Sequence, residues 1–188
     1  MPPSANSALL IIDVMNHFEF EGGQALARAA LPASRAIARL RDRYDAAGRP
    51  VIYANDNWMQ WQGEFGDLVA ACRARPGPSS EIAARLQPEK GHFYVLKPKN
   101  SAFLASALPV LLVQLGVSAL AITGIAADAC VLSTALDANM RDYAVWVPND
   151  CTAARDARAK ARALQLMRST IQADTRSTRA VAGLFPAT

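Results

Sequence analysis

Three residues that together could form the centre of a covalent hydrolase each follow an apolar run of the sequence. They are Asp13 at the end of "ALLIID", Lys97 in "FYVLKP", and Cys130, which comes after "ALAITG". A thiolate is a strong nucleophile, but a free thiol is mostly protonated at neutral pH. Asp13 can accept the thiol proton and return it to a leaving amine, and the ammonium group of Lys97 favours the thiolate. These residue types predict nucleophilic attack by Cys130 on a carbonyl carbon.

The stretch "GIAADACVL" (124–132) offers Cys130 further activation. We expect this residue in the first turn of a helix, where free backbone N–H groups and the helix dipole favour an anion. The helix end and Lys97 are therefore expected to lower the pKa of the Cys130 thiol, while an ionised Asp13 raises it. The small residues before Cys130 also let backbone N–H groups approach a developing oxyanion.

The elements that must position these residues are short apolar runs alternating with longer helical patterns. Strands are expected at 8–13, 50–55, 93–98, 119–124 and 144–149, with a sixth short strand near 173–178. Helices are expected within 22–48, 79–86, 103–116, 128–142 and 156–173, and 56–78 is expected to be one long irregular segment. The near-continuous apolar runs suit strands buried on both faces of a parallel sheet. The pattern predicts an α/β fold: a three-layer α/β/α, doubly wound (Rossmann-like), mainly parallel sheet of about six strands.

In an open α/β sheet, ligands bind beyond the carboxyl ends of the strands. The expected strands bring Asp13, Asn55, Asp56, Lys97, Cys130 and Asp150 to that edge. Singly, the three leading candidates have structural explanations: Cys130 as a small core residue, Asp13 as the cap of a turn, and Lys97 as a surface lysine. Their arrival at three strand ends favours a shared site.

Three sequence blocks resemble those of the isochorismatase-like cysteine hydrolases, a superfamily that includes nicotinamidases, N-carbamoylsarcosine amidohydrolase and isochorismatase. The blocks are "LLIIDVMNHF", "LKPKNSAF" (96–103) and "ITGIAADACVLSTALDA" (122–138), which are similar to the family patterns xxxxDxQNxF, KxxxSAF and xxGxxTxxCVxxTAxDA. They occur in family order, with family-like spacing, over nearly the whole chain. The resemblance implies a single isochorismatase-like hydrolase domain over residues 1–188.

The resemblance places a catalytic triad on Asp13, Lys97 and Cys130. The family's oxyanion hole is formed by the backbone N–H groups of the cysteine and of the residue four before it, which are here Cys130 and Ala126. In relatives a cis peptide bond without proline precedes that residue, which implies a cis bond between Ile125 and Ala126.

The chain also departs from the family patterns. Met15 stands where the family has Gln, and Ala126 stands where it has Thr. Nicotinamidases carry a metal site made of Asp-x-His after the second strand plus a later His. Here that stretch reads "NDNWMQW", with Trp58 in the His position after Asp56. The resemblance therefore implies no metal and no other cofactor, and it does not favour nicotinamidase activity.

The candidates for substrate contacts are Phe18, Asp56, Trp58 and Trp61. The three aromatic residues are expected either to line an apolar pocket or to belong to the core or to a subunit interface. His17 and His92 are expected to be structural or exposed. Segment 56–78 holds two tryptophans and a phenylalanine, which is more apolar surface than a monomer usually exposes. Relatives form closed oligomers, so we expect a homo-oligomer, at least a dimer.

The composition excludes several other classes of protein. Hydrophobic residues make up 52% and charged residues 19%, and the net charge is +4, as in globular chains. There is no basic run interleaved with aromatics and no phosphate-binding glycine motif, so nucleic acids and nucleotides are not expected partners. No apolar run approaches the ~18–20 residues of a membrane span, and the N-terminus lacks the basic region of a signal peptide. Three widely spaced cysteines without CxxC fit free thiols in a reducing cytoplasm.

We therefore predict a cytoplasmic cysteine amidohydrolase that cleaves an amide or carbamoyl C–N bond of a small molecule through a thioester. One alternative is an isochorismatase-type enol-ether hydrolase, with Asp13 as the acid and Cys130 as a bystander. The other is a non-catalytic binding module on the same fold. The presence of Cys130 favours the amidohydrolase, because the resemblance implies that enol-ether cleavage does not need it.

Overall fold

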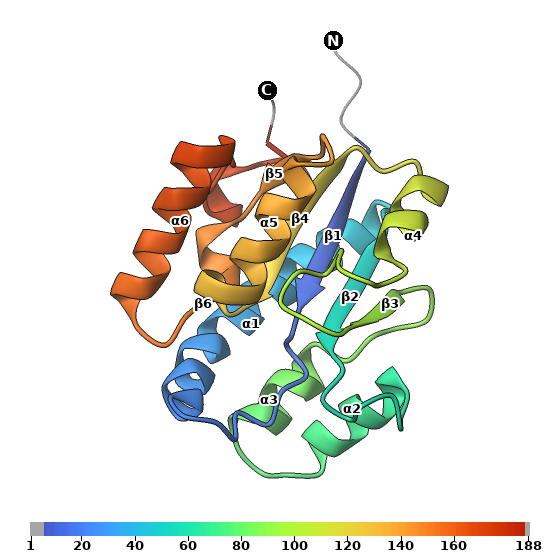
Figure 1. Cartoon of the computed structure of the whole chain (residues 1–188), viewed down its shortest axis with the longest axis vertical. Coiled ribbons are helices and arrows are strands. Elements are labelled where there is room, and N and C mark those ends of the chain that lie inside the picture. The colour runs from blue at the N-terminus through green and yellow to red at the C-terminus, as the bar shows by residue number, and fades with distance from the viewer. Residues whose placement is uncertain (1–5, 187–188) are drawn as a thin grey trace.

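A parallel sheet lies between two layers of helices in the computed structural model, which describes residues 6–186 (Figure 1). The strands are β1 (Ser7–Ile12), β2 (Val51–Asp56), β3 (Phe93–Lys97), β4 (Ala119–Ile125), β5 (Ala144–Trp146) and β6 (Thr152–Ala153). The helices are α1 (Gly23–Ala46), α2 (Phe65–Arg73), α3 (Pro78–Arg85), α4 (Leu108–Gln114), α5 (Leu132–Asn139) and α6 (Ala157–Ile171). A π-helical turn covers Ala127–Val131, and short 3₁₀ turns cover Asn149–Cys151 and Thr178–Ala180.

The order of the strands creates a crevice beside β1. The sheet runs β3-β2-β1-β4-β5, every pair is parallel, and β6 pairs with β4 beyond the end of β5. The chain first winds outward from β1 to β2 and β3, and then returns to the other side of β1 to form β4. Loops that leave the carboxyl ends of β1 and β4 therefore diverge, which is where open α/β sheets bind ligands.

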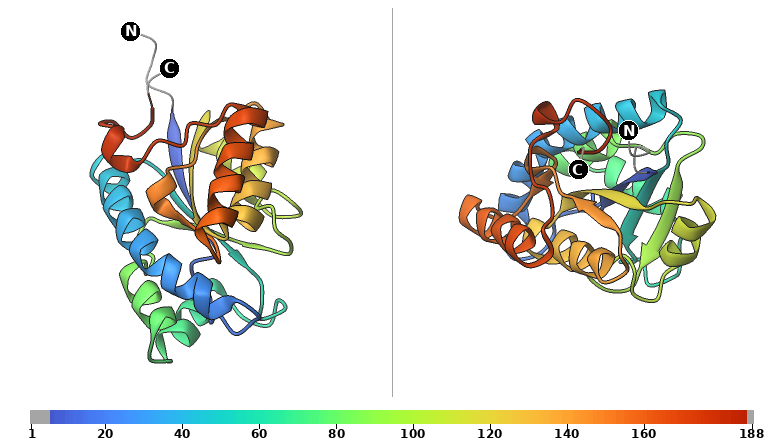
Figure 2. Two further views of the ribbon diagram at one scale, coloured as in Figure 1. Left: turned by 90° about the vertical axis from the view of Figure 1, so that its left-hand side faces the viewer. Right: turned by 90° about the horizontal axis from the view of Figure 1, so that it is seen from above.

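Strand β1 explains why the apolar runs are continuous instead of alternating. Leu9 and Ile11 pack in the core on the side of α1, α2 and α3, whereas Leu10 and Ile12 pack in the core on the side of α4, α5 and α6. Figure 2 shows α1 on one face of the sheet and α5 with α6 on the other. Because neighbouring side chains of a strand point to opposite faces, a sheet covered on both faces needs apolar residues at every position.

The predicted three-layer parallel sheet is confirmed, but its sixth strand lies elsewhere. Thr152–Ala153 pairs with β4, whereas the predicted segment near 173–178 contributes a single bridge between Asp174 and Trp146. The helix expected within 103–116 begins only at Leu108. Ala105 has a left-handed backbone (φ +48°), which interrupts a right-handed helix at this point.

Segment 56–78 is not irregular throughout, because it contains α2. The N–H group of Glu64 donates to the Asp67 carboxylate at 2.7 Å, and the two side chains form a capping box at the start of the helix. Phe65 and Leu68 are buried on one face of α2. The expectation that this segment exposes all its large aromatics is therefore wrong for Phe65, while Trp61 is 72% exposed.

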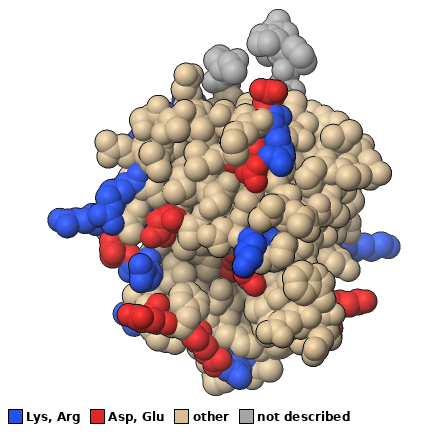
Figure 3. Space-filling view, viewed as in Figure 1, with Lys and Arg blue, Asp and Glu red and all other residues tan. Residues whose placement is uncertain are grey.

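Charged side chains of both signs are distributed over the surface. Figure 3 shows acidic and basic groups interspersed on one face of the molecule, without a broad basic area. Among residues 6–186, no helix combines the length and the hydrophobicity that crossing a bilayer requires.

Candidate active site

Asp13 follows β1 directly and is held by the ends of two other strands. The backbone turns at this residue with φ +53°, and its N–H group donates to the Ala54 carbonyl at 3.0 Å. Carboxylate atom Oδ1 accepts the N–H group of Asp56, the last residue of β2, at 2.6 Å. Atom Oδ2 lies 2.8 Å from Nζ of Lys97, the last residue of β3. Both carboxylate oxygens are thus fixed by neighbouring strand ends.

Lys97 joins the carboxylate to the thiol. Its side chain is fully buried, and Nζ also donates to the Lys99 carbonyl at 3.1 Å and lies 3.5 Å from Sγ of Cys130. A buried ammonium group needs a compensating charge, because removing it from water costs several kcal/mol. The structure therefore brings the three predicted residues Asp13, Lys97 and Cys130 into contact.

Gly124 allows this approach, because it lets β4 run close against β1. It pairs in register with Ile12, and a Cβ atom at this position would lie only 2.1 Å from the Ile12 carbonyl oxygen. The backbone at Gly124 also has φ +109°, which side chains other than glycine rarely permit. Any larger residue here would separate the two strand ends that carry Asp13 and Cys130.

The segment after β4 places two backbone groups at the cavity. The peptide bond between Ile125 and Ala126 is cis, as the family resemblance implies. Cys130 follows in the π-helical turn Ala127–Val131, while the regular helix α5 begins only at Leu132. The expectation of a first turn of α-helix at Cys130 is thus replaced by a wider turn. Both Ala126 and Cys130 line the cavity.

The pKa values indicate a protonated thiol beside a base in the resting site. Burial, reinforced by the charge of Asp13, raises the pKa of the Cys130 thiol to about 12, although Lys97 opposes this. Burial also raises the pKa of Asp13, although Lys97 lowers it in part. Burial alone would lower the pKa of Lys97, but Asp13 and Cys130 raise it above its usual value. Lys97 lowers the pKa of the thiol and Asp13 raises it, as expected, but burial, which the sequence does not predict, makes the net shift upward. Asp13 is placed to accept the thiol proton.

Asn55 fixes the chain that leaves Asp13. Its side chain accepts the N–H group of Met15 at 3.0 Å and donates to the carbonyl of the same residue at 3.0 Å. The indole N–H group of Trp58 also donates to that carbonyl, at 3.4 Å. Met15 stands where the family pattern has Gln. Its side chain is completely buried and packs in the core.

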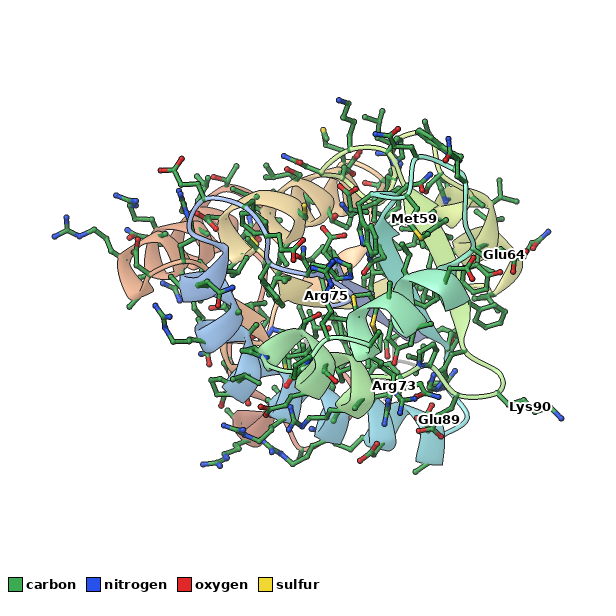
Figure 4. All side chains as sticks on the ribbon, turned by 90° about the horizontal axis from the view of Figure 1, so that it is seen from below. Met59, Glu64, Arg73, Arg75, Glu89 and Lys90 are labelled. Carbon is green, nitrogen blue, oxygen red and sulfur yellow. The ribbon has the colours of Figure 1, made fainter. Side chains whose placement is uncertain are left out.

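A cavity of about 580 Å³ opens over this cluster at the carboxyl edge of the sheet. It is lined by Asp13, Asn16, His17, Glu19, Phe20, Glu21, Leu26, Asp56, Trp58, Ile125, Ala126, Asp128, Ala129, Cys130 and Arg155. Figure 4 shows this end of the molecule, with the loop of Arg75 in the middle and Lys90 extending outward at the margin. Two of the four candidates for substrate contacts, Asp56 and Trp58, therefore lie at the cavity.

The other two candidates, Phe18 and Trp61, do not line it. Phe18 is only 2% exposed and packs in the core that α1 shares with β1. Trp61 is 72% exposed and lies in a turn. The backbone N–H group of Trp61 donates to the Asn57 side chain at 3.0 Å. Both residues have a left-handed backbone (φ +58° and +61°), which no hydrophobic pattern predicts and which reverses the direction of the side chain.

Sequence reasoning missed most of the cavity wall, including His17, Phe20 and Arg155. The ring of His17 lies 4.5 Å from that of Trp58, and its Nε2 atom is buried with no hydrogen-bond partner among the described residues. Phe20 is 50% exposed. His17 and Phe20 follow β1 by a few residues, and this position past a strand end is the one signal that could have identified them. Nothing local marks Arg155.

The cavity offers few ligands for a metal ion. Asp56 and His17 both line it, but within residues 6–186 no three His, Cys, Asp or Glu side chains are grouped so that they could hold one. Trp58 stands two residues after Asp56, where the Asp-x-His pattern of nicotinamidases has its histidine. The indole N–H group of Trp58 cannot ligate a cation. His92 instead precedes β3, at the end of that strand opposite Lys97, with Nε2 2.9 Å from the Asp45 carboxylate. These residues do not fit a nicotinamidase-type metal site.

The sequence matches proteins of one family over most of its length. The family model described as the isochorismatase domain matches residues 7–179. The uncharacterized isochorismatase family protein YaaI of Bacillus subtilis strain 168 is 36% identical over 170 residues, which cover 90% of this chain and 93% of that protein. The ureidoacrylate amidohydrolase RutB of Yersinia enterocolitica is 28% identical over 179 residues, covering 80% of this chain and 76% of that protein.

The fold is also similar to that of a crystal structure of an isochorismatase family protein from Desulfovibrio vulgaris. The TM-score is 0.77 at 27% sequence identity, and the alignment covers 94% of this chain and 96% of that one. The sequence and the fold therefore point to the same relatives.

Proposed function

Because the chain belongs to the isochorismatase family of hydrolases, we propose that it is a cysteine amidohydrolase that cleaves an amide or carbamoyl C–N bond of a small molecule through a thioester. The observation that carries this proposal is the position of Lys97, whose Nζ lies 2.8 Å from the Asp13 carboxylate and 3.5 Å from Sγ of Cys130 beside one cavity. The similarity to a ureidoacrylate amidohydrolase supports a C–N bond as the target.

The first step transfers the thiol proton to Asp13 while sulfur attacks the substrate carbonyl carbon. A thiol with a pKa of about 12 does not ionise by itself at neutral pH, so transfer and attack are coupled. The raised pKa of Asp13 suits a proton acceptor, because a weakly basic carboxylate would not hold the proton. The ammonium group of Lys97 stabilises the negative charge that develops on sulfur.

The backbone N–H groups of Ala126 and Cys130 hold the oxyanion of the tetrahedral intermediate. The C–N bond then breaks, and Asp13 returns its proton to the leaving nitrogen, which departs as ammonia or an amine. The acyl group remains on Cys130 as a thioester. A water molecule that gives a proton to Asp13 attacks the thioester carbon, and the proton passes to the departing sulfur, which restores the thiol.

Ammonia release from a panel of small primary amides and ureido compounds tests this proposal. We expect turnover of at least one member of the panel, and loss of turnover in both Cys130→Ala and Cys130→Ser. Cys72→Ala is the matched control, because Cys72 is fully buried in the core and away from the cavity. A Cys130→Ala protein with undiminished activity on a vinyl ether would instead establish the enol-ether alternative.

Alkylation tests the remaining alternative, a binding module without catalysis. Cys130 is partly exposed, whereas Cys72 and Cys151 are buried. Brief treatment with iodoacetamide should therefore label Cys130 first, as mass spectrometry of the peptides would report. Equal labelling of the three thiols in the folded protein would contradict an accessible nucleophile. The three free cysteines also support our proposal that the enzyme works in a reducing cytoplasm.

A further inference from the structure

We propose that the cavity selects substrates whose remote end, opposite the reacting carbonyl group, carries a positive charge, and that it disfavours substrates with a carboxylate there. The inference rests on the proposed function for the identity of the reacting bond. The charge preference itself belongs to the cavity and can be measured without turnover.

Carboxylates outnumber cations around the cavity. Its lining contains the carboxylates Asp13, Glu19, Glu21, Asp56 and Asp128, and one side chain of the Lys or Arg type, that of Arg155. Lys97 neutralises Asp13, and Arg75, which Figure 4 places in the middle of this end of the molecule, forms an ion pair with Glu19. Within residues 6–186, Glu21, Asp56 and Asp128 form no ion pair. Three unpaired carboxylates face one guanidinium group.

Glu21 is exposed, but the depth of the other two unpaired carboxylates increases the imbalance. Asp56 ends β2 beside the catalytic cluster, and Asp128 lies two residues before Cys130 in the same π-helical turn; both are only partly exposed. Arg155 is exposed, and its side chain packs along Gly22, where a Cβ atom would lie 2.6 Å from the arginine Cδ. Solvent and salt screen an exposed charge more strongly than a partly buried one. The net potential near the nucleophile is therefore negative.

Aromatic faces complete a site suited to an organic cation. The rings of Trp58 and His17 lie 4.5 Å apart, centroid to centroid, and are tilted by 52° at the wall, and Phe20 is half exposed at the cavity. Ammonium groups are attracted to the faces of aromatic rings, most strongly to that of tryptophan, and also to carboxylates. A carboxylate at the same position would be repelled by the carboxylates of the cavity and would be attracted only by Arg155. The geometry thus favours an amine-bearing amide or urea over an acidic one.

Charged thiol reagents measure this potential directly. We would measure how fast Cys130 reacts with two methanethiosulfonates, one carrying a trimethylammonium-ethyl group and the other a sulfonate-ethyl group. Each rate is divided by the rate at which the same reagent reacts with 2-mercaptoethanol, and the two quotients are compared as a ratio, cationic over anionic. We expect the cationic reagent to react about tenfold faster, because the potential acts on the two reagents with opposite sign. The ratio should approach one at about 1 M salt, where the Debye length is only ~3 Å. Cys130→Ser identifies the fraction of label due to Cys130.

Two substitutions should move the ratio in opposite directions. Asp128→Asn removes a carboxylate and lowers the preference for the cationic reagent, while Arg155→Gln removes the opposing cation and raises it. Asp142→Asn is the matched control, because Asp142 is exposed, follows α5 at the opposite end of the helix from Cys130, and has a left-handed backbone (φ +64°) that asparagine tolerates. It should leave the ratio unchanged. A ratio at or below one, or insensitivity to Asp128→Asn, overturns the inference.

Turnover of three matched amides separates this inference from the proposed function. They are 4-aminobutanamide, pentanamide and glutaramate, in which three methylene groups separate the amide from an ammonium, a methyl or a carboxylate group. The expected order of kcat/KM is cation, then neutral compound, then anion. Faster hydrolysis of glutaramate, with loss of that advantage in Arg155→Gln, would show that Arg155 anchors a carboxylate and would overturn the inference. If the cationic thiol reagent is preferred but no amide or urea in the panel is hydrolysed, the charge preference stands and the amidohydrolase assignment falls.

Discussion

The ammonium group of Lys97 lies 2.8 Å from the carboxylate of Asp13, and the two side chains are only 0% and 7% exposed. Each charge makes the burial of the other tolerable, since an isolated charge in this position would cost several kcal/mol. The same pair serves chemistry, because Asp13 stays a base beside a thiol that keeps its proton until substrate arrives. Stability and activity should therefore depend on the same two residues.

Lys97→Met should reduce both properties. The substitution leaves the Asp13 carboxylate buried without its partner, so we expect the free energy of unfolding to fall by about 3–5 kcal/mol and turnover to fall by about 100-fold. Urea denaturation and ammonia release measure the two effects. Lys99→Met is the control, because the Lys99 side chain is exposed and only its backbone carbonyl contacts Lys97.

A double variant distinguishes a loss of catalysis from a loss of folding. Asp13→Asn combined with Lys97→Met removes both charges, and it should recover part of the stability that Lys97→Met loses while remaining inactive. If Lys97→Met keeps the wild-type urea midpoint, the pair is not the stabilising interaction described above.

Stability should decline with rising pH in the alkaline range because of Cys130. The pKa of its thiol rises from the usual 9.0 to about 12 in the folded protein, mainly through burial and the charge of Asp13. Between these values the folded state keeps a proton that the unfolded state has lost, so the free energy of unfolding falls as pH increases. The raised pKa of Lys97 acts in the same direction.

Urea midpoints from pH 8 to 11 test this dependence. Cys130→Ala should lose stability less steeply over this range than the wild type, because it lacks the titrating thiol. Ser169→Ala, at an exposed position of α6, should keep the wild-type slope. Parallel curves for wild type and Cys130→Ala would mean that the folded and unfolded thiols titrate alike.

The sequence predicts the positions of those site residues that stand at the ends of regular strands. Asp13 and Lys97 stand at the ends of β1 and β3, where the apolar run and the parallel topology together fix their location. Cys130 lies where the sequence predicts it, but burial, reinforced by the charge of Asp13, raises the pKa of its thiol more than Lys97 lowers it. That shift depends on distances between segments far apart in the sequence, which no local pattern contains.

Irregular backbone accounts for most of the errors. Phe18 and Trp61 have left-handed conformations that direct one ring into the core and the other into solvent. The capping box at Glu64 begins α2 inside 56–78, a segment rich in Trp, Gly and Pro that the sequence predicts to be irregular. Arg155 reaches the cavity only because β6 returns the chain beside β4, a pairing of two residues that hydrophobic periodicity cannot detect.

We predict a homo-oligomer, at least a dimer, with an interface on β3 and α4. β3 is an edge strand of the sheet, and this region has four exposed apolar side chains: Phe93 (36%), Tyr94 (53%), Val110 (63%) and Val113 (74%). Unpaired edges and apolar surface of this kind favour association. Light scattering at micromolar concentration should give at least twice the mass of one chain. Val113→Asp should give the monomer, whereas Met140→Asp, at a residue with 72% exposure elsewhere, should not. A monomeric wild type would refute the prediction.

Chelation should leave hydrolysis unchanged. Every group used in the proposed reaction is a side chain or backbone N–H group of the chain, and Asp56 and His17 alone are too few ligands to bind a divalent ion tightly. We therefore expect the same turnover after dialysis against excess EDTA, and no increase on adding zinc or iron. Nicotinamide should be a poor substrate, because the resemblance implies that nicotinamidases use their metal ion to bind the pyridine nitrogen, and Trp58 replaces a ligand of that site. Loss of activity in EDTA that zinc or iron restores would contradict this prediction and would assign Asp56 and His17 to a metal site.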